Sequence, residues 1–241
     1  MAVRKAYGFL AGFFILNLLT WMASRPVQAV WTNVPPPPAK SSAILGAYGD
    51  KEVAYRSIGY MLQNLGDHGG NVRNIDEYNY TNLKKWLFLT DELNQKSNFV
   101  PRLAGLYFGI TKKPEHAAHL VEYLSYIGAR PYDGKWRWLL LASTYSKNKM
   151  KDIDQAIQYA KILQNMDYQG SKPPVANRLT PMLYFSKGDK PASFIHFMEV
   201  LHKTYETLPA REQEFVLDFF CREFQGFYGE YPACPNSSYN L

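Results

Sequence analysis

The hydrophobic pattern divides the chain into one long apolar segment followed by a series of shorter segments. Residues 6–23 are eighteen consecutive positions without a charge. At a rise of about 1.5 Å per residue, a helix of this length just spans the hydrocarbon core of a bilayer. Apolar residues then recur at helical spacing in residues 50–65, 82–93, 100–110, 115–127, 136–145, 153–163, 176–185, 191–205 and 210–225.

No segment shows the strict polar–apolar alternation of a half-buried strand. The pattern therefore predicts an all-α fold preceded by one transmembrane helix. The helices are expected either to stack as antiparallel pairs in a solenoid or to form an irregular bundle. The expected organisation is a membrane anchor in residues 1–29, a proline-rich linker in 30–49, the helical domain in 50–225 and an aromatic, proline-containing tail in 226–241.

Residues 135–170 contain the clearest pair of helices. The first is apolar almost all round, which is typical of a helix buried on both sides. Asp152 then marks the start of the second helix, because its carboxylate can accept hydrogen bonds from the free amides of a first turn. Gln155 follows three positions later, as in a capping box.

This pair resembles a tetratricopeptide repeat. The family's first-helix pattern is matched by Trp138, Leu141, Ala142 and Tyr145, and the small residues of its second helix by Ala156 and Ala160. Looser matches place Tyr107, Tyr145 and Tyr184 at intervals of 38 and 39 positions, whereas the family's period is about 34. The resemblance covers roughly residues 80–206 and implies a divergent solenoid, the alternative being a chance recurrence within an irregular bundle.

Members of this family bind peptides in a groove lined by the first helix of each pair. The resemblance implies that the groove positions here are Arg102, Phe108, Trp136, Ser143, Arg178 and Phe185. The three aromatic residues among them are equally well explained by core packing. Leu140 stands where chaperone-binding members need an asparagine for their carboxylate clamp, which argues against that class of ligand.

The N-terminal segment has two interpretations. As a retained anchor, it would contact lipid mainly through Phe9, Phe13, Phe14, Leu18 and Trp21, with Trp21 at the interface. As a signal peptide, it would be cleaved after Ala29. The apolar run is longer than the usual core of a signal peptide, which favours the anchor. In both cases the basic pair Arg4 and Lys5 stays in the cytoplasm and the rest of the chain is exported.

The residues after the anchor are expected to hold the domain away from the membrane. Pro35 to Pro38 form a run of four prolines, which favours an extended and rather stiff spacer.

Charge is distributed unevenly along the chain. The whole sequence has a formal net charge of +6, of which residues 1–49 contribute +4 without any acidic residue. The remainder is thus only mildly basic, and we find no concentrated basic face of the kind that a nucleic-acid-binding protein requires. Nucleic acid is not an expected partner.

The two cysteines, Cys221 and Cys234, lie thirteen positions apart and do not form a CxxC pair. In an oxidising compartment they are expected to form a disulfide, which would fix the C-terminal tail to the last helix.

No constellation in the sequence predicts a particular chemistry. His116 and His119 share a helix face, but two histidines hold a metal only when a third ligand approaches. There is no nucleophile elbow and no phosphate-binding loop. We therefore expect no catalytic residue, cofactor or metal.

Three functions are compatible with these features. The leading hypothesis is a single-pass scaffold subunit on the extracytoplasmic side of a membrane or envelope complex, with other protein subunits and the bilayer as its partners. The alternatives are a soluble exported binding protein and an enzyme whose site the sequence does not reveal.

Overall fold

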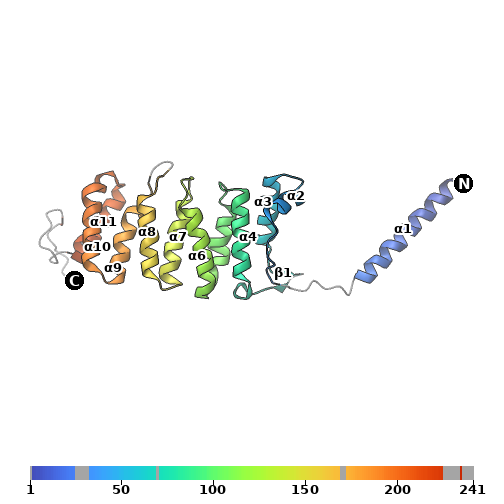
Figure 1. The fold of residues 1–241 in the computed structure, drawn as a ribbon, viewed down its shortest axis with the longest axis horizontal. Helices are drawn as coiled ribbons and strands as arrows, with labels where there is room; N and C mark the ends of the chain where they lie inside the picture. The colour runs from blue at the N-terminus through green and yellow to red at the C-terminus, as the bar shows by residue number, and fades with distance from the viewer. Residues whose placement is uncertain (1, 25–32, 69–70, 169–171, 225–233, 235–241) are drawn as a thin grey trace.

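The computed structural model describes residues 2–24, 33–68, 71–168, 172–224 and 234, and it is all-helical apart from one very short hairpin (Figure 1). The helices are α1 (Ala2–Ser24), α2 (Lys40–Gly46), α3 (Lys51–Gln63), α4 (Tyr80–Leu93), α5 (Phe99–Arg102), α6 (Pro114–Gly128), α7 (Trp136–Asn148), α8 (Ile153–Asn165), α9 (Val175–Lys187), α10 (Lys190–Lys203) and α11 (Ala210–Phe224). Short 3-10 turns lie at Ile75–Glu77 and Tyr205–Thr207.

α5 continues without a break into a π-helical segment, Leu103–Tyr107, and a 3-10 turn, Phe108–Ile110. We call the whole element helix 99–110. From α3 to α11 the helices stand side by side in a single elongated row, in sequence order (Figure 1). Helix 99–110 with α6, α7 with α8, and α9 with α10 form successive helical hairpins, each with a first and a second helix.

Hydrogen bonds connect each first helix to the next. Three donors of α7 and its following turn reach helix 99–110 or the residues that flank it: the Trp138 indole N–H to Asn98 Oδ1 at 2.7 Å, the Tyr145 hydroxyl to the Gly105 carbonyl at 2.5 Å, and Lys149 Nζ to the Thr111 carbonyl at 2.8 Å. Lys147 Nζ in turn donates to Ser186 Oγ of α9 at 3.0 Å. The first helices therefore form one continuous layer.

Small residues lie where neighbouring helices meet. The four alanines at these contacts are completely buried: Ala104, Ala142, Ala156 and Ala160. Gly128, the last residue of α6, lies so close to α7 that an added Cβ would sit 2.8 Å from the Leu139 Cα. Real Cβ atoms do not approach so closely, so glycine is required there.

The predicted start of α8 is confirmed. Asp152 caps the helix, and its Oδ1 accepts a hydrogen bond from the Gln155 amide at 2.8 Å. Asp50 and Asp189 cap α3 and α10 in the same way. These caps satisfy amides that have no partner inside the helix.

The proline run in the linker 30–49 was expected to be an extended spacer, and that expectation is wrong for the described residues 33–49. Here the chain packs along α4: Asn82 Nδ2 donates to the Val34 carbonyl at 2.9 Å, and the Trp86 indole N–H donates to the Pro35 carbonyl at 2.8 Å. Val34 is only 3% exposed. A proline lacks an amide donor but keeps its carbonyl acceptor, which is what α4 binds.

Two further elements were not predicted. α2 forms between the prolines and α3. The glycine-containing turn after α3 includes a two-stranded antiparallel pair, β1 (Asp67–His68) and β2 (Asn71–Val72).

The core has two principal parts. A large cluster extends from Val34 to Ala142 across α2 to α7. A second cluster, rich in phenylalanine, joins α10 to α11 and includes Phe197, Phe220 and Phe224. Cys234 packs against this second cluster.

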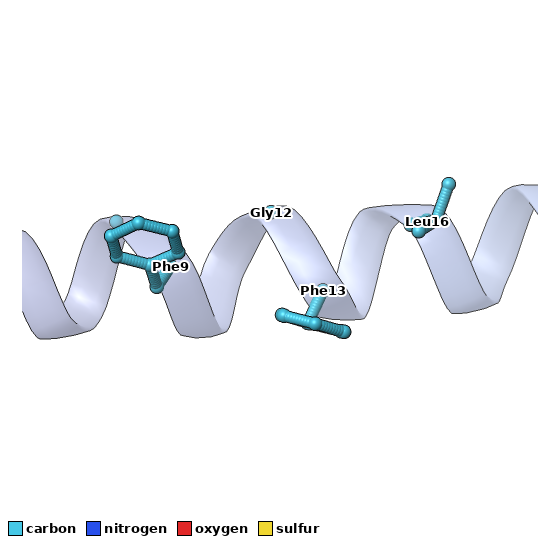
Figure 2. A pocket seen from close by; sticks show the side chains of 5 residues that line it. Phe9, Gly12, Phe13 and Leu16 are labelled. Atoms are coloured by element: carbon cyan, nitrogen blue, oxygen red, sulfur yellow. The ribbon is translucent and has the colours of Figure 1, made fainter.

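α1 is long and apolar enough to cross a membrane, and none of its apolar window, Tyr7–Ser24, is buried. Phe9, Phe13 and Leu16 project from it around the bare backbone at Gly12 (Figure 2). An exposed apolar helix of this kind is typical of a segment that lipid or another helix covers.

Candidate partner-binding surface

Two of the six positions expected to line a groove are buried inside the domain. Phe108 is 0% exposed, and its carbonyl accepts a hydrogen bond from the Tyr80 hydroxyl at 3.0 Å. Ser143 is 1% exposed and donates to the Ala156 carbonyl of α8 at 2.8 Å. Both side chains hold helices together, so the expectation that they contact a ligand is wrong.

Two more positions are occupied by contacts within the domain. Arg178 forms an ion pair with Glu212 of α11 at 3.1 Å, and its guanidinium carbon lies 4.5 Å from the centre of the Phe215 ring. Phe185 packs edge-to-face against Phe219, with the ring centres 5.3 Å apart. These residues join α9 to α11.

Trp136 and Arg102 are the remaining two. Trp136 is half-buried, and the Arg137 guanidinium lies 5.1 Å from its ring centre. Arg102 is exposed and forms no ion pair with any residue that the structure describes. Of the six predicted positions, Arg102 alone is exposed, whereas Trp136, Arg178 and Phe185 are half-buried.

Sequence reasoning missed the most exposed apolar residues of the same helix. Phe99, Leu106 and Ile110 are 42%, 60% and 61% exposed. Together with Arg102 they form a line of exposed side chains at intervals of three or four positions, which we call the exposed strip. The spacing is visible in the sequence, but helix 99–110 is apolar on every side, so the pattern does not reveal which side faces water.

The neighbouring helices frame this strip. On one side, the Phe99 ring lies 3.0 Å from the point where a Cβ on Gly59 of α3 would stand. On the other side, Leu141 of α7 packs over Gly105, since an added Cβ there would lie 2.6 Å from the leucine. The strip is therefore held between α3 and α7.

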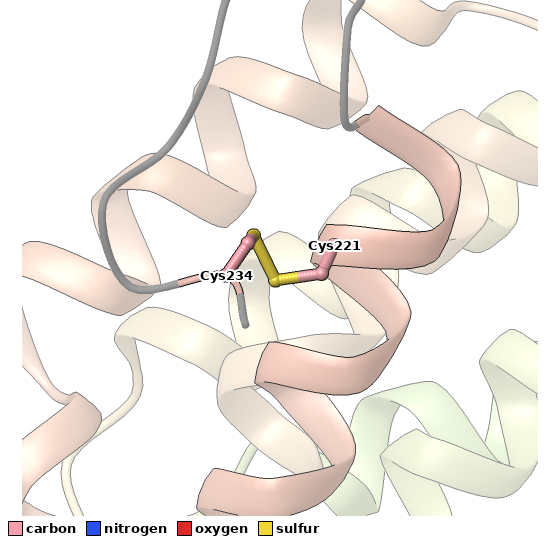
Figure 3. The surroundings of a disulfide bond; sticks show 2 residues. All are labelled: Cys221 and Cys234. Carbon is pink, nitrogen blue, oxygen red and sulfur yellow. A yellow bond between two sulfur atoms is a disulfide. The ribbon is translucent and has the colours of Figure 1, made fainter. Parts of the chain in front are cut away.

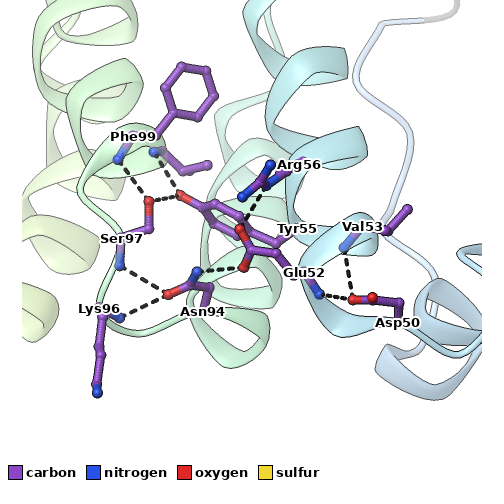
Figure 4. Close-up of polar contacts among 10 residues, drawn as sticks. Asp50, Glu52, Val53, Tyr55, Arg56, Asn94, Lys96, Ser97 and Phe99 are labelled. Atoms are coloured by element: carbon purple, nitrogen blue, oxygen red, sulfur yellow. Dashed lines mark hydrogen bonds and ion pairs between the residues drawn. The ribbon is translucent and has the colours of Figure 1, made fainter.

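A polar network fixes helix 99–110 against α3 (Figure 4). The Tyr55 hydroxyl donates to Ser97 Oγ at 2.7 Å and accepts from the Val100 amide at 3.3 Å. Asn94 Nδ2 donates to Glu52 Oε2 at 2.8 Å (Figure 4). These bonds satisfy polar groups in the turn between α4 and helix 99–110, and they fix the orientation of the strip.

A buried charge cluster lies beneath the same turn. Asp91 and Arg130 form a bidentate ion pair with both N–O distances 2.6 Å. Lys135 is 0% exposed and its Nζ donates to the Ser97 carbonyl at 2.6 Å. Burial lowers the pKa of Lys135 to about 8, although the Asp91 carboxylate partly offsets the effect. This buried amine therefore connects the start of α7 to the turn between α4 and helix 99–110.

His116 and His119 also serve packing. His116 stacks on the Tyr80 ring with the ring centres 4.1 Å apart, and His119 Nε2 lies 3.3 Å from Thr81 Oγ1. Burial lowers the pKa of both imidazoles. Among the described residues, no three His, Cys, Asp or Glu side chains come together as metal ligands would.

Cys221 of α11 and Cys234 form a disulfide in the structure, with their Cα atoms 5.5 Å apart (Figure 3). The bond attaches Cys234 to the phenylalanine-rich cluster. Most of the tail expected in residues 226–241 lies outside the described residues.

No protein-family model, curated protein or solved structure matches this chain. The fold and the surface by themselves define an all-helical protein with one helix that is long and apolar enough to cross a membrane.

Proposed function

We propose that the protein is a membrane-anchored helical-repeat scaffold that binds another protein through the exposed strip on helix 99–110. The observation that carries this proposal is the line formed by Phe99, Arg102, Leu106 and Ile110, held rigidly between α3 and α7. Exposed apolar side chains gathered on one face of a soluble domain are typical of protein contact sites.

The repeat character supports the proposal. Hydrogen bonds join helix 99–110 and its flanking residues to α7, and α7 to α9. The buried alanines Ala104 and Ala142 lie 38 positions apart on the first two of these helices. Each hairpin then buries its apolar face only against its neighbours, as in a tetratricopeptide-like solenoid. Such a row offers an extended surface to a polypeptide partner.

The proposed orientation places the domain outside the cytoplasm and α1 in the bilayer. Arg4 and Lys5 precede the apolar run, which favours a cytoplasmic N-terminus. A disulfide between Cys221 and Cys234 is compatible with an oxidising compartment.

A soluble exported binding protein is the second candidate, and one observation favours it. Asn33 Nδ2 donates to the Glu77 carbonyl at 2.9 Å, and its Oδ1 accepts from the Asn79 amide at 2.8 Å. A chain cleaved after Ala29 would keep these contacts and hence the whole helical row. Intact mass of the protein purified from its native membrane decides between the two: a start at Met1 or Ala2 supports the anchor, and a start at Val30 supports cleavage.

Site-specific photo-crosslinking tests the binding surface. A photoreactive amino acid replaces Leu106 in the full chain, and a matched variant carries it at Tyr126 of α6, which is 56% exposed on a second helix. We expect one defined protein to crosslink in membranes from position 106 and not from 126. Absence of protein crosslinks from both positions, with no protein co-purifying, would contradict the scaffold proposal.

A further inference from the structure

The first helices carry only positive charge. Residues 95–113 contain four basic residues, residues 134–151 contain five and residues 172–188 contain three, and none of these segments has an acidic residue. They comprise helix 99–110, α7, α9 and the turns beside them. The mild total charge of the domain arises because the acids lie elsewhere.

The second helices hold those acids. α6, α8 and α10 each contain at least one, among them Glu122, Asp154 and Glu199. Because the first helices form a continuous layer, alternation along the sequence becomes a separation of charge in space. A sequence-level count of net charge does not detect it.

Several of these bases are committed to contacts within the domain. Lys149 binds the Thr111 carbonyl, Arg178 pairs with Glu212, and Lys187 pairs with Asp154 at 2.6 Å. Seven exposed bases of these segments form no ion pair with the described residues: Lys96, Arg102, Lys112, Lys113, Arg137, Lys151 and Lys172. All but Lys172 lie on helix 99–110, on α7 or in the turns beside them.

Arg102 and Arg137 are the two exposed arginines of the first-helix segments. Arg102 belongs to the strip itself. Arg137 lies on the adjacent helix α7, next to Trp138, whose indole N–H binds Asn98 at the start of helix 99–110. The layer thus carries Phe99, Leu106 and Ile110 together with Arg102 on helix 99–110, and Arg137 on the adjacent helix. Neither residues 95–113 nor residues 134–151 contain an acidic residue.

We propose that the partner segment bound by the exposed strip is acidic and amphipathic, with apolar side chains that contact the strip and carboxylates that face Arg102 and Arg137. This inference rests on the proposed scaffold function and adds the chemistry of the partner. Charge complementarity of this kind selects partners and accelerates their association. An amphipathic helix supplies apolar anchors at intervals of three or four residues, which is the spacing of the strip.

An anionic membrane surface is the competing occupant, and the arrangement favours a polypeptide. Six of the seven exposed bases without an ion pair to the described residues are distributed across two adjacent helices, helix 99–110 and α7, with their turns. Of these two helices, only helix 99–110 carries large exposed apolar side chains, which are Phe99, Leu106 and Ile110. A polypeptide crossing the row meets both features, whereas a bilayer contact is expected to combine apolar and basic groups along one helix, as in interfacial amphipathic helices.

Binding of designed peptides to the full chain in nanodiscs tests the proposal. The probe is a labelled helical peptide with leucines on one face and glutamates on the other. One control peptide replaces each glutamate with lysine, and a second replaces each leucine with serine. We expect fluorescence anisotropy to detect binding of the first peptide and weak or no binding of either control.

Charge reversal locates the binding site. The double variant Arg102→Glu/Arg137→Glu should weaken binding of the acidic peptide by about tenfold or more, because two exposed ion pairs are replaced by repulsion. It should also favour the lysine peptide. Lys85→Glu, on exposed α4 surface, provides the control for net charge, and circular dichroism checks that each variant is folded.

The outcomes separate the inference from the proposed function. Equal weakening by Lys85→Glu and by the Arg102→Glu/Arg137→Glu variant would overturn the assigned site. If peptide binding disappears when the anionic lipid phosphatidylglycerol is included in the nanodisc, lipid competes for the strip, and the strip would be assigned to membrane contact. A crosslinked partner at position 106 whose contacting segment is neutral or basic would refute the acidic chemistry and leave the scaffold function standing.

Discussion

At the scale of single residues, polar side chains set the register between neighbouring helices. α7 and its flanking turns donate to carbonyl or amide oxygens of the preceding first helix through Lys135, Trp138, Tyr145 and Lys149. Apolar contacts alone allow neighbouring helices to slide past one another, whereas each of these hydrogen bonds requires one particular acceptor and so fixes the register. The polar contacts therefore align the exposed strip with α7.

Trp138→Ala should strongly destabilise the domain. Trp138 is 8% exposed, packs over Gly105 and donates its indole N–H to Asn98. Truncating a buried aromatic residue to alanine costs about 3–5 kcal/mol. Urea unfolding measures the change, with Arg137→Ala as a neighbouring exposed control that should have little effect. A loss of stability no larger than that of Arg137→Ala would show that the contact between these helices is peripheral.

The buried amine of Lys135 should make stability depend on alkaline pH. Its pKa is lowered from 10.5 to about 8. Between these values the folded chain has released a proton that the unfolded chain still binds, so raising the pH stabilises the fold. Below the lower value both states are protonated and the contribution is constant.

Lys135→Met isolates this effect from other titrating groups. The free energy of unfolding of the natural chain minus that of the variant should be flat below pH 8 and rise between pH 8 and 10.5. Urea unfolding of both proteins across this range gives the difference. A difference independent of pH would mean that Lys135 is hydrated in the folded state.

At the scale of elements, the sequence predicts most helices because each has its own signals. Apolar periodicity locates α3 to α11, and Asp152 places the start of α8 correctly. α2 was not predicted. The docking of residues 33–38 was not predicted either, because it depends on Asn82 and Trp86 of α4 binding the carbonyls of Val34 and Pro35. Contacts of that kind leave no local pattern in either segment.

Trp86→Phe should loosen the docked proline segment. The substitution keeps an aromatic ring in a buried site but removes the N–H that binds the Pro35 carbonyl at 2.8 Å. Loss of one such bond costs about 1 kcal/mol. Hydrogen exchange followed by mass spectrometry should show faster exchange in residues 39–47 and little change in α8.

The matched control is Tyr60→Phe, which alters an exposed ring on α3. Equal exchange in the two variants and the natural chain would contradict the idea that the indole hydrogen bond holds the segment in place.

At the scale of the whole molecule, the candidate surface was only partly accessible from the sequence. Mapping family positions selected Arg102, which is exposed, but also Phe108 and Ser143, which are buried. The period here is longer than the family's, so residues transferred by counting turn toward different sides of their helices. The charge separation emerges only after the helices are sorted into first and second members, which requires the three-dimensional order.

The last prediction concerns the compartment in which the whole domain folds. If the domain faces an oxidising space, Cys221 and Cys234 should be bonded, since their Cα atoms lie 5.5 Å apart within the range that a disulfide prefers. Closing a loop of this size stabilises the fold by up to about 3 kcal/mol on the chain-entropy model. The bond fastens Cys234 to the phenylalanine-rich cluster at the C-terminal end of the row, where α11 has no following helix among the described residues.

Thiol labelling of natively expressed protein, denatured without reductant, tests the bond. We expect no labelled cysteine before reduction and two after it. Two thiols that react without reductant would show that the disulfide is absent. The case for an extracytoplasmic domain would then depend on Arg4 and Lys5 alone. Because the strip, the charged layer and the helical row do not depend on the bond, such a result would change the compartment of the proposed partner and leave its chemistry unchanged.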